Sequence, residues 1–257
     1  MFSILSLLVT AALMSHYGFQ SYAAILDRQN INLDNNLQAN VVPPRKKTFV
    51  QPYVRIKGMP ETINLIRSEP IALECQVYAS PNPYVSWLKN GDPIDQFEEE
   101  SNEISAVQPF SIAHMTAKLV VSTPRDGDVY TCVAMSGVNQ LSLSTTVSVQ
   151  EDPDLMPLDI VPPMKPVITS VYNEVIQTVG TNIVLPCRVH SDSKAQVYWE
   201  DNGDNVIYGN SRFRILSSGD LLITGLRWDD MGVFTCTAKN MYGKDSVGTF
   251  IYPAKAS

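Results

Sequence analysis

The residues best able to do chemistry in this 257-residue chain are its four cysteines, Cys75, Cys132, Cys187 and Cys236. A structural zinc site usually takes thiolates in pairs that are only a few residues apart. No two cysteines of this chain are that close, so we expect no metal site. The four thiols can instead form disulfides, for which three pairings are open.

Nucleophilic catalysis is the second chemistry to consider. Of the three histidines, His16 lies in a segment that we expect to be removed, which leaves His114 and His190. His190 follows Cys187 by three residues and is expected to be a solvated side chain where a strand ends. Serine is abundant, but the Gly-x-Ser-x-Gly motif of a nucleophile elbow is absent. We therefore expect no catalytic residue and no cofactor, and a protein that is not an enzyme.

An internal repeat organises the cysteines and two of the tryptophans. In each copy a Trp follows the first Cys by 12 residues, and a second Cys comes 57 or 49 residues after the first. The two copies are Cys75–Trp87–Cys132 and Cys187–Trp199–Cys236.

The segments around these landmarks have the period of β-strands. Ile, Leu, Cys and Val occupy every second position over 71–77 and again over 183–189. The run 84–88 is rich in aromatic and β-branched residues and ends at Asn90-Gly91, a strong hairpin signal. No long segment keeps a helical period, so the pattern predicts an all-β protein.

Short strands with a Cys…Trp…Cys framework resemble an immunoglobulin-type sandwich. The resemblance implies that a Cys on strand B and a Cys on strand F bridge two packed sheets, with the strand C Trp against the bridge. Pairing within each repeat fits both Cys-to-Trp spacings with one core per domain. We therefore predict two immunoglobulin-like β-sandwiches in tandem. The predicted B–F disulfides are Cys75–Cys132 and Cys187–Cys236, and the predicted core residues are Trp87, Trp199, Tyr130 and Phe234. Trp228, by contrast, is expected to be exposed.

The stretch that leads to Cys236 resembles the intermediate set of immunoglobulin domains, as does the Gly243 hairpin after it. The resemblance implies that Asp230 accepts hydrogen bonds at the E–F corner, with Arg212 or Arg214 as its ionic partner. Two residues before the second Cys, that set usually has a Tyr whose hydroxyl binds backbone. Tyr130 keeps this residue in the first repeat, and Phe234 replaces it in the second.

The rest of the chain indicates export. Residues 4–14 form an uncharged apolar run, too short to span a bilayer and right for a secretory signal, with cleavage after Ala23 or Ala24. We expect a secreted protein without membrane insertion, and the net charge of −7 disfavours nucleic acid as a partner. Five prolines in the linker should hold the two domains apart. The expected divisions are 1–23 signal peptide, 24–50 polar leader, 51–150 domain 1, 151–166 Pro-rich linker and 167–253 domain 2.

Several runs in the second repeat are similar to the secreted two-immunoglobulin-domain proteins of invertebrates. These runs are Asn182–His190, Gly219–Ile223, Trp228–Gly232, Gly243–Asp245 and Thr249–Pro253. That family includes the nematode zwei-Ig proteins and the insect neural/ectodermal development factor, also called the imaginal morphogenesis late protein. The resemblance implies a non-enzymatic binder of an extracellular or cell-surface protein, acting in nervous system development by axon maintenance. The insect members imply the alternative of binding an insulin-like peptide. The identity of the partner and the oligomeric state stay open.

The main length difference between the repeats is the segment 94–117, which holds apolar residues among charged ones. Apolar groups rimmed by charge suit a protein-binding patch, so Phe97, Ile104 and Phe110 are candidate partner contacts. The alternative is that these are ordinary strand residues that face the core. Residues 51–150 hold six Lys and Arg against eleven Asp and Glu, a balance of −5, which would steer domain 1 toward cationic partners.

Overall fold

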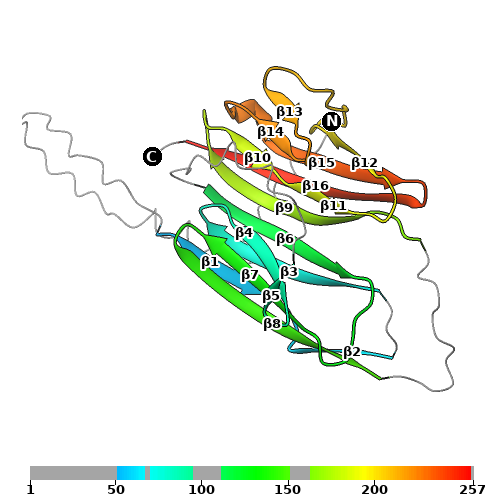
Figure 1. Cartoon of the computed structure of the whole chain (residues 1–257). Helices are drawn as coiled ribbons and strands as arrows, with labels where there is room; N and C mark the ends of the chain where they lie inside the picture. The colour runs from blue at the N-terminus through cyan, green and yellow to red at the C-terminus, as the bar shows by residue number, and fades with distance from the viewer. Residues whose placement is uncertain (1–50, 67–69, 95–110, 151–162, 256–257) are drawn as a thin grey trace, which may run out of the picture. The chain divides into compact units, whose positions relative to one another are not determined.

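A computed structural model describes residues 51–66, 70–94, 111–150 and 163–255, all within one compact unit, Lys47–Ser257 (Figure 1). The predicted signal peptide, the polar leader and most of the linker lie outside these residues. Domain 1 contains β1 (Tyr53–Lys57), β2 (Thr62–Leu65), β3 (Ile71–Ser80), β4 (Tyr84–Lys89), β5 (Asp92–Pro93), β6 (Ser111–Val121), β7 (Val129–Ser136) and β8 (Asn139–Val149). Domain 2 contains β9 (Val167–Thr178), β10 (Ile183–Leu185), β11 (Cys187–His190), β12 (Gln196–Glu200), β13 (Phe213–Ile215), β14 (Leu221–Ile223), the 3₁₀ turn η2 (Trp228–Asp230), β15 (Gly232–Asn240) and β16 (Gly243–Ala254).

Domain 1 is a sandwich of two sheets. One contains β1, β3 and β6 in that order, and the other has the order β2-β8-β7-β4-β5. The period of two predicted for 71–77 is present in β3, where Leu73, Cys75 and Val77 are buried and the residues between them are not. The hairpin predicted at Asn90-Gly91 joins β4 to β5, and both residues have positive φ, 53° and 93°.

Domain 2 has the same plan with a strand that changes sheets. Pro186 separates β10 from β11, because proline has no N–H to donate to a ladder. On one side of this break β10 pairs with β14, in a small sheet that also contains β13. On the other side β11 pairs with β9. The opposite layer contains β9, β16, β15 and β12, with β9 and β16 parallel.

The predicted disulfides are confirmed. Cys75 bonds Cys132 and Cys187 bonds Cys236, with Cα atoms 6.4 and 6.5 Å apart. Trp87 lies opposite Cys132 and Trp199 opposite Cys236 in the strand registers, so each indole packs beside its bridge. Both tryptophans are buried, as are Tyr130 and Phe234. Each domain therefore has its own core around one bridge.

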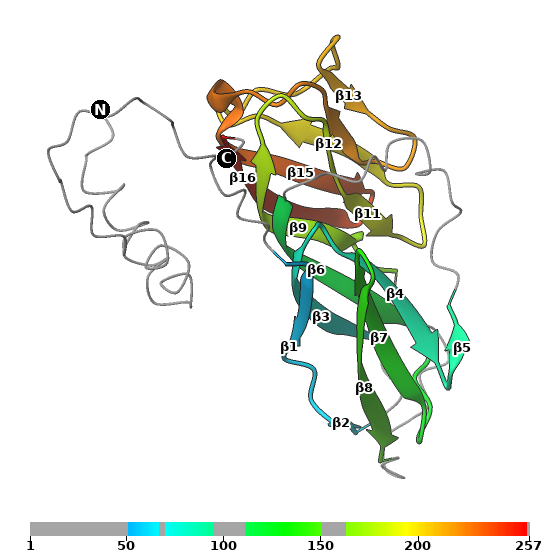
Figure 2. The ribbon, with the colours of Figure 1, turned by 90° about the vertical axis from the view of Figure 1, so that its left-hand side faces the viewer.

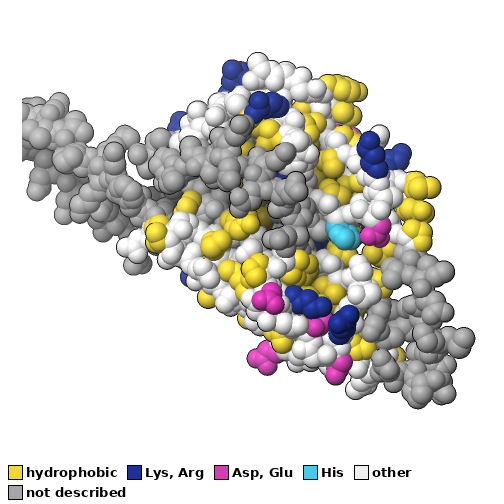
Figure 3. Space-filling view, in the orientation of Figure 1, with side chains coloured by type: hydrophobic (Ala, Val, Ile, Leu, Met, Phe, Trp, Pro, Cys, Tyr) yellow, Lys and Arg dark blue, Asp and Glu magenta, His cyan; other side chains and the backbone are white. Residues whose placement is uncertain are grey.

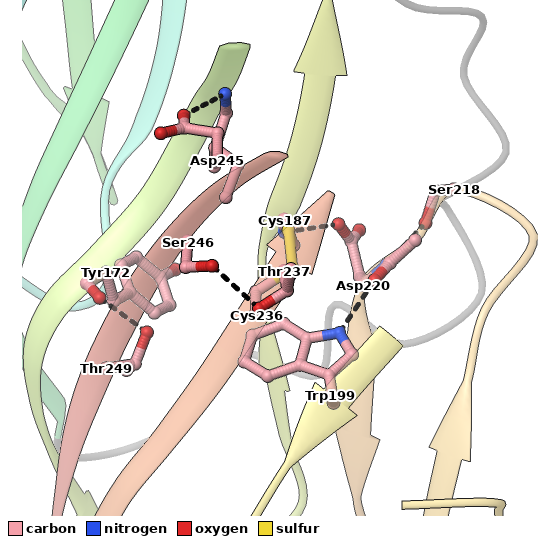
Figure 4. The surroundings of a disulfide bond; sticks show 12 residues. Tyr172, Cys187, Trp199, Ser218, Asp220, Cys236, Thr237, Asp245, Ser246 and Thr249 are labelled. Carbon is pink, nitrogen blue, oxygen red and sulfur yellow. Dashed lines mark hydrogen bonds between the residues drawn. A yellow bond between two sulfur atoms is a disulfide. The ribbon is translucent and has the colours of Figure 1, made fainter. Parts of the chain in front are cut away.

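The indole of Trp199 is anchored by a glycine turn (Figure 4). Its Nε1 donates a hydrogen bond to the carbonyl of Gly219 at 2.8 Å. Gly219 has φ of +93°, and a Cβ there would come within 2.9 Å of the Cys187 carbonyl oxygen, so only glycine fits. The next residue, Asp220, accepts the Cys187 N–H at 2.9 Å and pairs with Arg188 at 2.7 Å. This turn therefore satisfies polar groups on both sides of the bridge.

The E–F corner is the turn between β6 and β7 in domain 1 and between β14 and β15 in domain 2. Aligning the two repeats on their second cysteines does not predict which Asp makes the same contact in both corners. In domain 2 Asp230 accepts the Arg227 N–H and pairs with Arg212, the first of the two expected partners. In domain 1 the equivalent backbone bond goes to Asp128, which accepts the Arg125 N–H at 3.2 Å. Asp126, which stands at the same distance from its Cys as Asp230, instead accepts the Val149 N–H.

Asp128 also changes what Tyr130 does. The hydroxyl of Tyr130 donates to the Asp128 carboxylate at 3.2 Å, rather than to backbone as the family pattern implied. Burial would raise the pKa of Asp128, but hydrogen bonds from Lys89, Asn90 and the Arg125 N–H outweigh it and lower that pKa. The corner of domain 1 is therefore a buried ionic cluster held by Lys89 at 2.8 Å.

The two domains are not held apart, contrary to the expectation from the Pro-rich linker. Strand β6 of domain 1 pairs antiparallel with β9 of domain 2, from Ser111 opposite Gln177 to Ala117 opposite Ser170. The result is one eight-stranded sheet with the path β1-β3-β6-β9-β16-β15-β12. Ala113 and Met115 of β6 belong to the core cluster of domain 2, so this seam between the domains is apolar as well as hydrogen-bonded.

The burial of the tryptophans predicts a contrast in stability. Replacing Trp199 by Ala leaves a cavity beside the bridge and an unpaired carbonyl, and should lower the free energy of unfolding by ~3–5 kcal/mol. Replacing Trp228, which is 49% exposed, should cost far less. Urea unfolding of the two secreted variants measures the difference, and equal losses would contradict this account of the core.

Candidate binding surface

The described residues offer no metal centre, since no group of three or more His, Cys, Asp or Glu in those ranges could hold an ion. No helix in the same ranges is long and apolar enough to cross a membrane. His190 lies at the end of β11, with its Nε2 3.7 Å from a carboxylate oxygen of Asp192. The remaining candidate is therefore a surface, and the face of the eight-stranded sheet that points away from the two cores is the one considered next.

An apolar row crosses this face at the seam. Ile112 of β6 lies opposite Ile176 of β9, which in turn lies opposite Tyr252 of β16. Their neighbours along each strand, such as Ala113, Val175 and Ile251, are buried in the core, so the three side chains of the row point outward. The ring of Trp228 meets Tyr252 edge-on at 5.8 Å and extends the row. Figure 2 follows the sheet from β16 through β9 and β6 to β3.

The adjacent row mixes polar and apolar groups. Tyr78, His114, Glu174, Phe250 and Val233 stand opposite one another in turn across β3, β6, β9, β16 and β15. The rings of Tyr78 and His114 are stacked, with centroids 4.1 Å apart and planes 8° from parallel. We call the residues of these two rows, with Trp228, the outer face.

Two members of the outer face, His114 and Tyr78, have shifted pKa values. Burial lowers the pKa of His114, and the charge of Lys57 lowers it further against the opposing effect of Glu74. Its Nε2 is buried and has no hydrogen-bond partner among the described residues. Burial, with a smaller contribution from the charge of Glu174, raises the pKa of Tyr78. Both groups therefore favour their neutral forms, which suits an apolar surface.

The outer face combines aromatic and aliphatic groups that are still accessible. Tyr252 and Val233 are 40% and 41% exposed, and Trp228 is more exposed than either. An antiparallel sheet with one solvated face normally alternates apolar-in and polar-out. β9 departs from this rule, because Gln177 is fully buried while Ile176 points outward. The inversion places Ile176 among the apolar side chains of the outer face, and contiguous exposed apolar groups of this kind often mark interaction sites.

Only part of the predicted binding segment lies in the described residues. Phe97, Ile104 and Phe110 lie outside them. The end of the segment forms the first half of β6, where Ile112 belongs to the outer face and Ala113, Met115 and Ala117 point into the cores. Residues 111–117 thus divide between the two interpretations of the segment, binding patch and strand core.

Sequence reasoning did not single out Ile176, Tyr252 or Trp228 as binding residues, although it correctly predicted that Trp228 is exposed. A signal was present in β9, where an inward Gln and an outward Ile reverse the usual alternation. The distribution of charge does not indicate a binding site on the face shown in Figure 3, because its basic and acidic side chains form small groups among hydrophobic clusters. No field of a single sign covers the described part of that face.

These observations define a tandem immunoglobulin-domain protein with an apolar face shared by both domains. A family model for the immunoglobulin domain matches residues 52–136 and 165–240. The chain is 30% identical to the neural/ectodermal development factor IMP-L2 of Drosophila melanogaster over 233 residues, which cover 89% of this chain and 87% of that protein. It is 27% identical to the Zwei Ig domain protein zig-2 of Caenorhabditis elegans, over 80% of this chain and 87% of that one.

A solved structure agrees with these relatives. The crystal structure of neural ectodermal development factor IMP-L2 matches with a TM-score of 0.68 at 29% identity, over 82% of this chain and 99% of that chain. The chain therefore belongs to the immunoglobulin-domain family, among the two-domain proteins that these relatives represent.

The buried imidazole of His114 predicts a pH dependence. Because the folded-state pKa is depressed, the unfolded chain takes up the proton first as the pH falls below about 6.5. Stability should be complete above that pH and should decline as the pH falls toward the folded-state pKa. Urea unfolding at about pH 7.5 and 5.5 should show a larger loss for the wild type than for His114→Phe. An equal loss would mean that other groups carry the dependence.

Proposed function

We propose that this chain is a secreted, non-enzymatic immunoglobulin protein that binds a protein outside the cell. We propose further that it acts in nervous system development by maintaining the position of axons or neurons. The observation that carries the binding role is the outer face, which crosses both domains without interruption. The names of its relatives, a neural/ectodermal development factor and a Zwei Ig domain protein, support a role in the nervous system.

The chemistry of the outer face favours a folded protein as the partner. Interface centres are depleted of charge and enriched in aromatic side chains, as this face is with Trp228, Tyr252, Phe250 and Tyr78. The continuous sheet fixes these groups relative to one another before any partner arrives, so little ordering is needed on binding. Within the outer face Glu174 carries the only formal charge at neutral pH, opposite the neutral His114.

The experiment removes accessible outer-face groups without touching either core. The double variant Trp228→Ser/Tyr252→Ser should fold and be secreted, and should lose at least about tenfold in binding to cultured neurons, or ~1.4 kcal/mol. Tyr208→Ser is the matched control, because Tyr208 is 93% exposed and lies outside the outer face. Equal binding by wild type and double variant would exclude the outer face, and equal losses in both variants would show that the effect is not specific to it.

The segment 94–117 remains a second candidate contact. We propose that Phe97, Ile104 and Phe110 add to the surface that Ile112 begins. Exchanging residues 95–110 for a short Gly-Ser linker, which leaves β6 and its pairing with β9 intact, tests this in the same binding assay. Normal secretion with full binding would remove the segment from the interface.

A second function is favoured by the extent of the apolar row. Four side chains, Ile112, Ile176, Tyr252 and Trp228, follow one line across the seam. Such a row could cover the apolar surface of a small folded hormone, so we propose as the alternative an extracellular carrier that sequesters an insulin-like peptide. A pull-down of synthetic insulin-like peptides on the secreted protein separates the two. Capture that Trp228→Ser/Tyr252→Ser abolishes would favour the carrier, and no capture would leave the neuronal role.

A further inference from the structure

One end of domain 2 gathers lysines from three separate segments. The tip of the β15–β16 hairpin is held by Asn240, whose Oδ1 accepts the N–H groups of Tyr242 and Gly243 at 2.8 and 3.1 Å. Its Nδ2 donates to the Met164 carbonyl and to Ser191 Oγ, both at 3.0 Å. The buried side-chain amide of Asn240 therefore joins the hairpin tip to the residues before β9 and to the loop between β11 and β12.

Each of these three segments carries lysine. Lys165 follows Met164, and Lys194 lies three residues after Ser191 in the same loop. Lys239 and Lys244 are exposed and directly opposite each other across β15 and β16. We call these four residues the lysine tip.

Little acidic charge balances the lysine tip. Asp245 lies 3.8 Å from Lys165, but its other oxygen accepts the Ile168 N–H at 2.9 Å. Asp192 lies beside His190. Among the described residues no carboxylate lies within ion-pair distance of the other three lysines. Like charges directly opposite across a sheet are destabilising, so the Lys239–Lys244 pair is a feature that an anionic ligand would relieve.

Three acidic residues of domain 2 lie at the other end. Asp201 and Asp204 lie in the turn after β12, and Asp229 lies in η2, just before β15 begins. Asn202 of the same turn accepts the Val233 N–H, which places that turn at the start of β15, opposite the hairpin tip. The lysine tip is therefore a local cationic feature in a domain whose balance over 167–257 is −1, with eight basic and nine acidic residues.

We propose that the lysine tip binds a sulfated glycosaminoglycan chain of the cell surface or matrix. Next to the lysine pair, on the same side of the sheet, Thr237 and Ser246 are joined by a hydrogen bond of 2.9 Å between their hydroxyls. Thr237 is buried and holds the exposed Ser246 in place, so the ammonium groups and the Ser246 hydroxyl are available to the sulfates and hydroxyls of a linear sugar chain. Binding here leaves the outer-face apolar row uncovered, because that row lies toward the far ends of the same strands.

The test is affinity for immobilised heparin across a salt series. Wild-type protein should be retained at near-physiological salt, about 0.15 M, and Lys239→Ser/Lys244→Ser should bind about tenfold more weakly with a shallower salt dependence. Arg214→Ser/Lys255→Ser is the matched control, because it removes the same charge from exposed positions away from the tip and should bind like wild type. The melting temperature of the lysine variant should equal or exceed that of wild type, since like-charge repulsion is removed.

Three results would overturn the proposal. One is the absence of heparin binding by the wild type, and another is an equal loss in the control variant. The third is unchanged binding by the lysine variant, which would move the interaction to another part of the chain. Phosphatidylcholine vesicles containing phosphatidylserine form the parallel arm, and retention by these vesicles without retention by heparin would make the ligand a membrane instead.

Discussion

The arrangement of this protein depends on the hydrogen bonds between β6 and β9. An immunoglobulin sandwich leaves the edges of its sheets unpaired, and an unpaired edge must be covered, charged or shortened if the protein is to stay soluble. Here the edge of β6 is covered by the first strand of the next domain. The rows of side chains on the outer face depend on this pairing of β6 with β9, because a row continues from one strand to the next only when the two strands are paired in register.

The same pairing explains why a Pro-rich linker does not act as a spacer in this chain. The position of β9 is determined by the seven residue pairs that it forms with β6 and by the apolar contacts of the seam, rather than by the linker. The apolar seam involves Ala113 and Met115, which are contributed by one domain to the core of the other. Both side chains are buried, and an unbranched Met can adapt its shape to an irregular core.

Much of the fold was predictable from the sequence, because its landmarks are local and repeated. The Cys–Trp spacing of 12 residues fixes which strand faces which bridge, so both disulfides and the positions of the tryptophans follow. The corner of domain 1 was not predictable in the same way, since Asp126 and Asp128 are both acidic and only the backbone path selects the one that receives the Arg125 N–H. The seam was the least predictable, because backbone groups form it and any sequence can supply those. In the sequence of β9, the inward Gln177 and the outward Ile176 are the signal of the seam, and they also indicate the part of the outer face that lies there.

Strand β9 has both edges occupied, by β6 on one side and by β11 and β16 on the other. Strand β9 is therefore part of both sandwiches. Removing the strands on one of its sides would expose the backbone amide groups of β9 along that side. If the chain were divided within the linker, each fragment would have an unpaired strand edge that is prone to aggregation. The boundary between the repeats in the sequence is thus crossed by backbone pairing, so a transferable unit that keeps the edges of β6 and β9 paired contains both repeats.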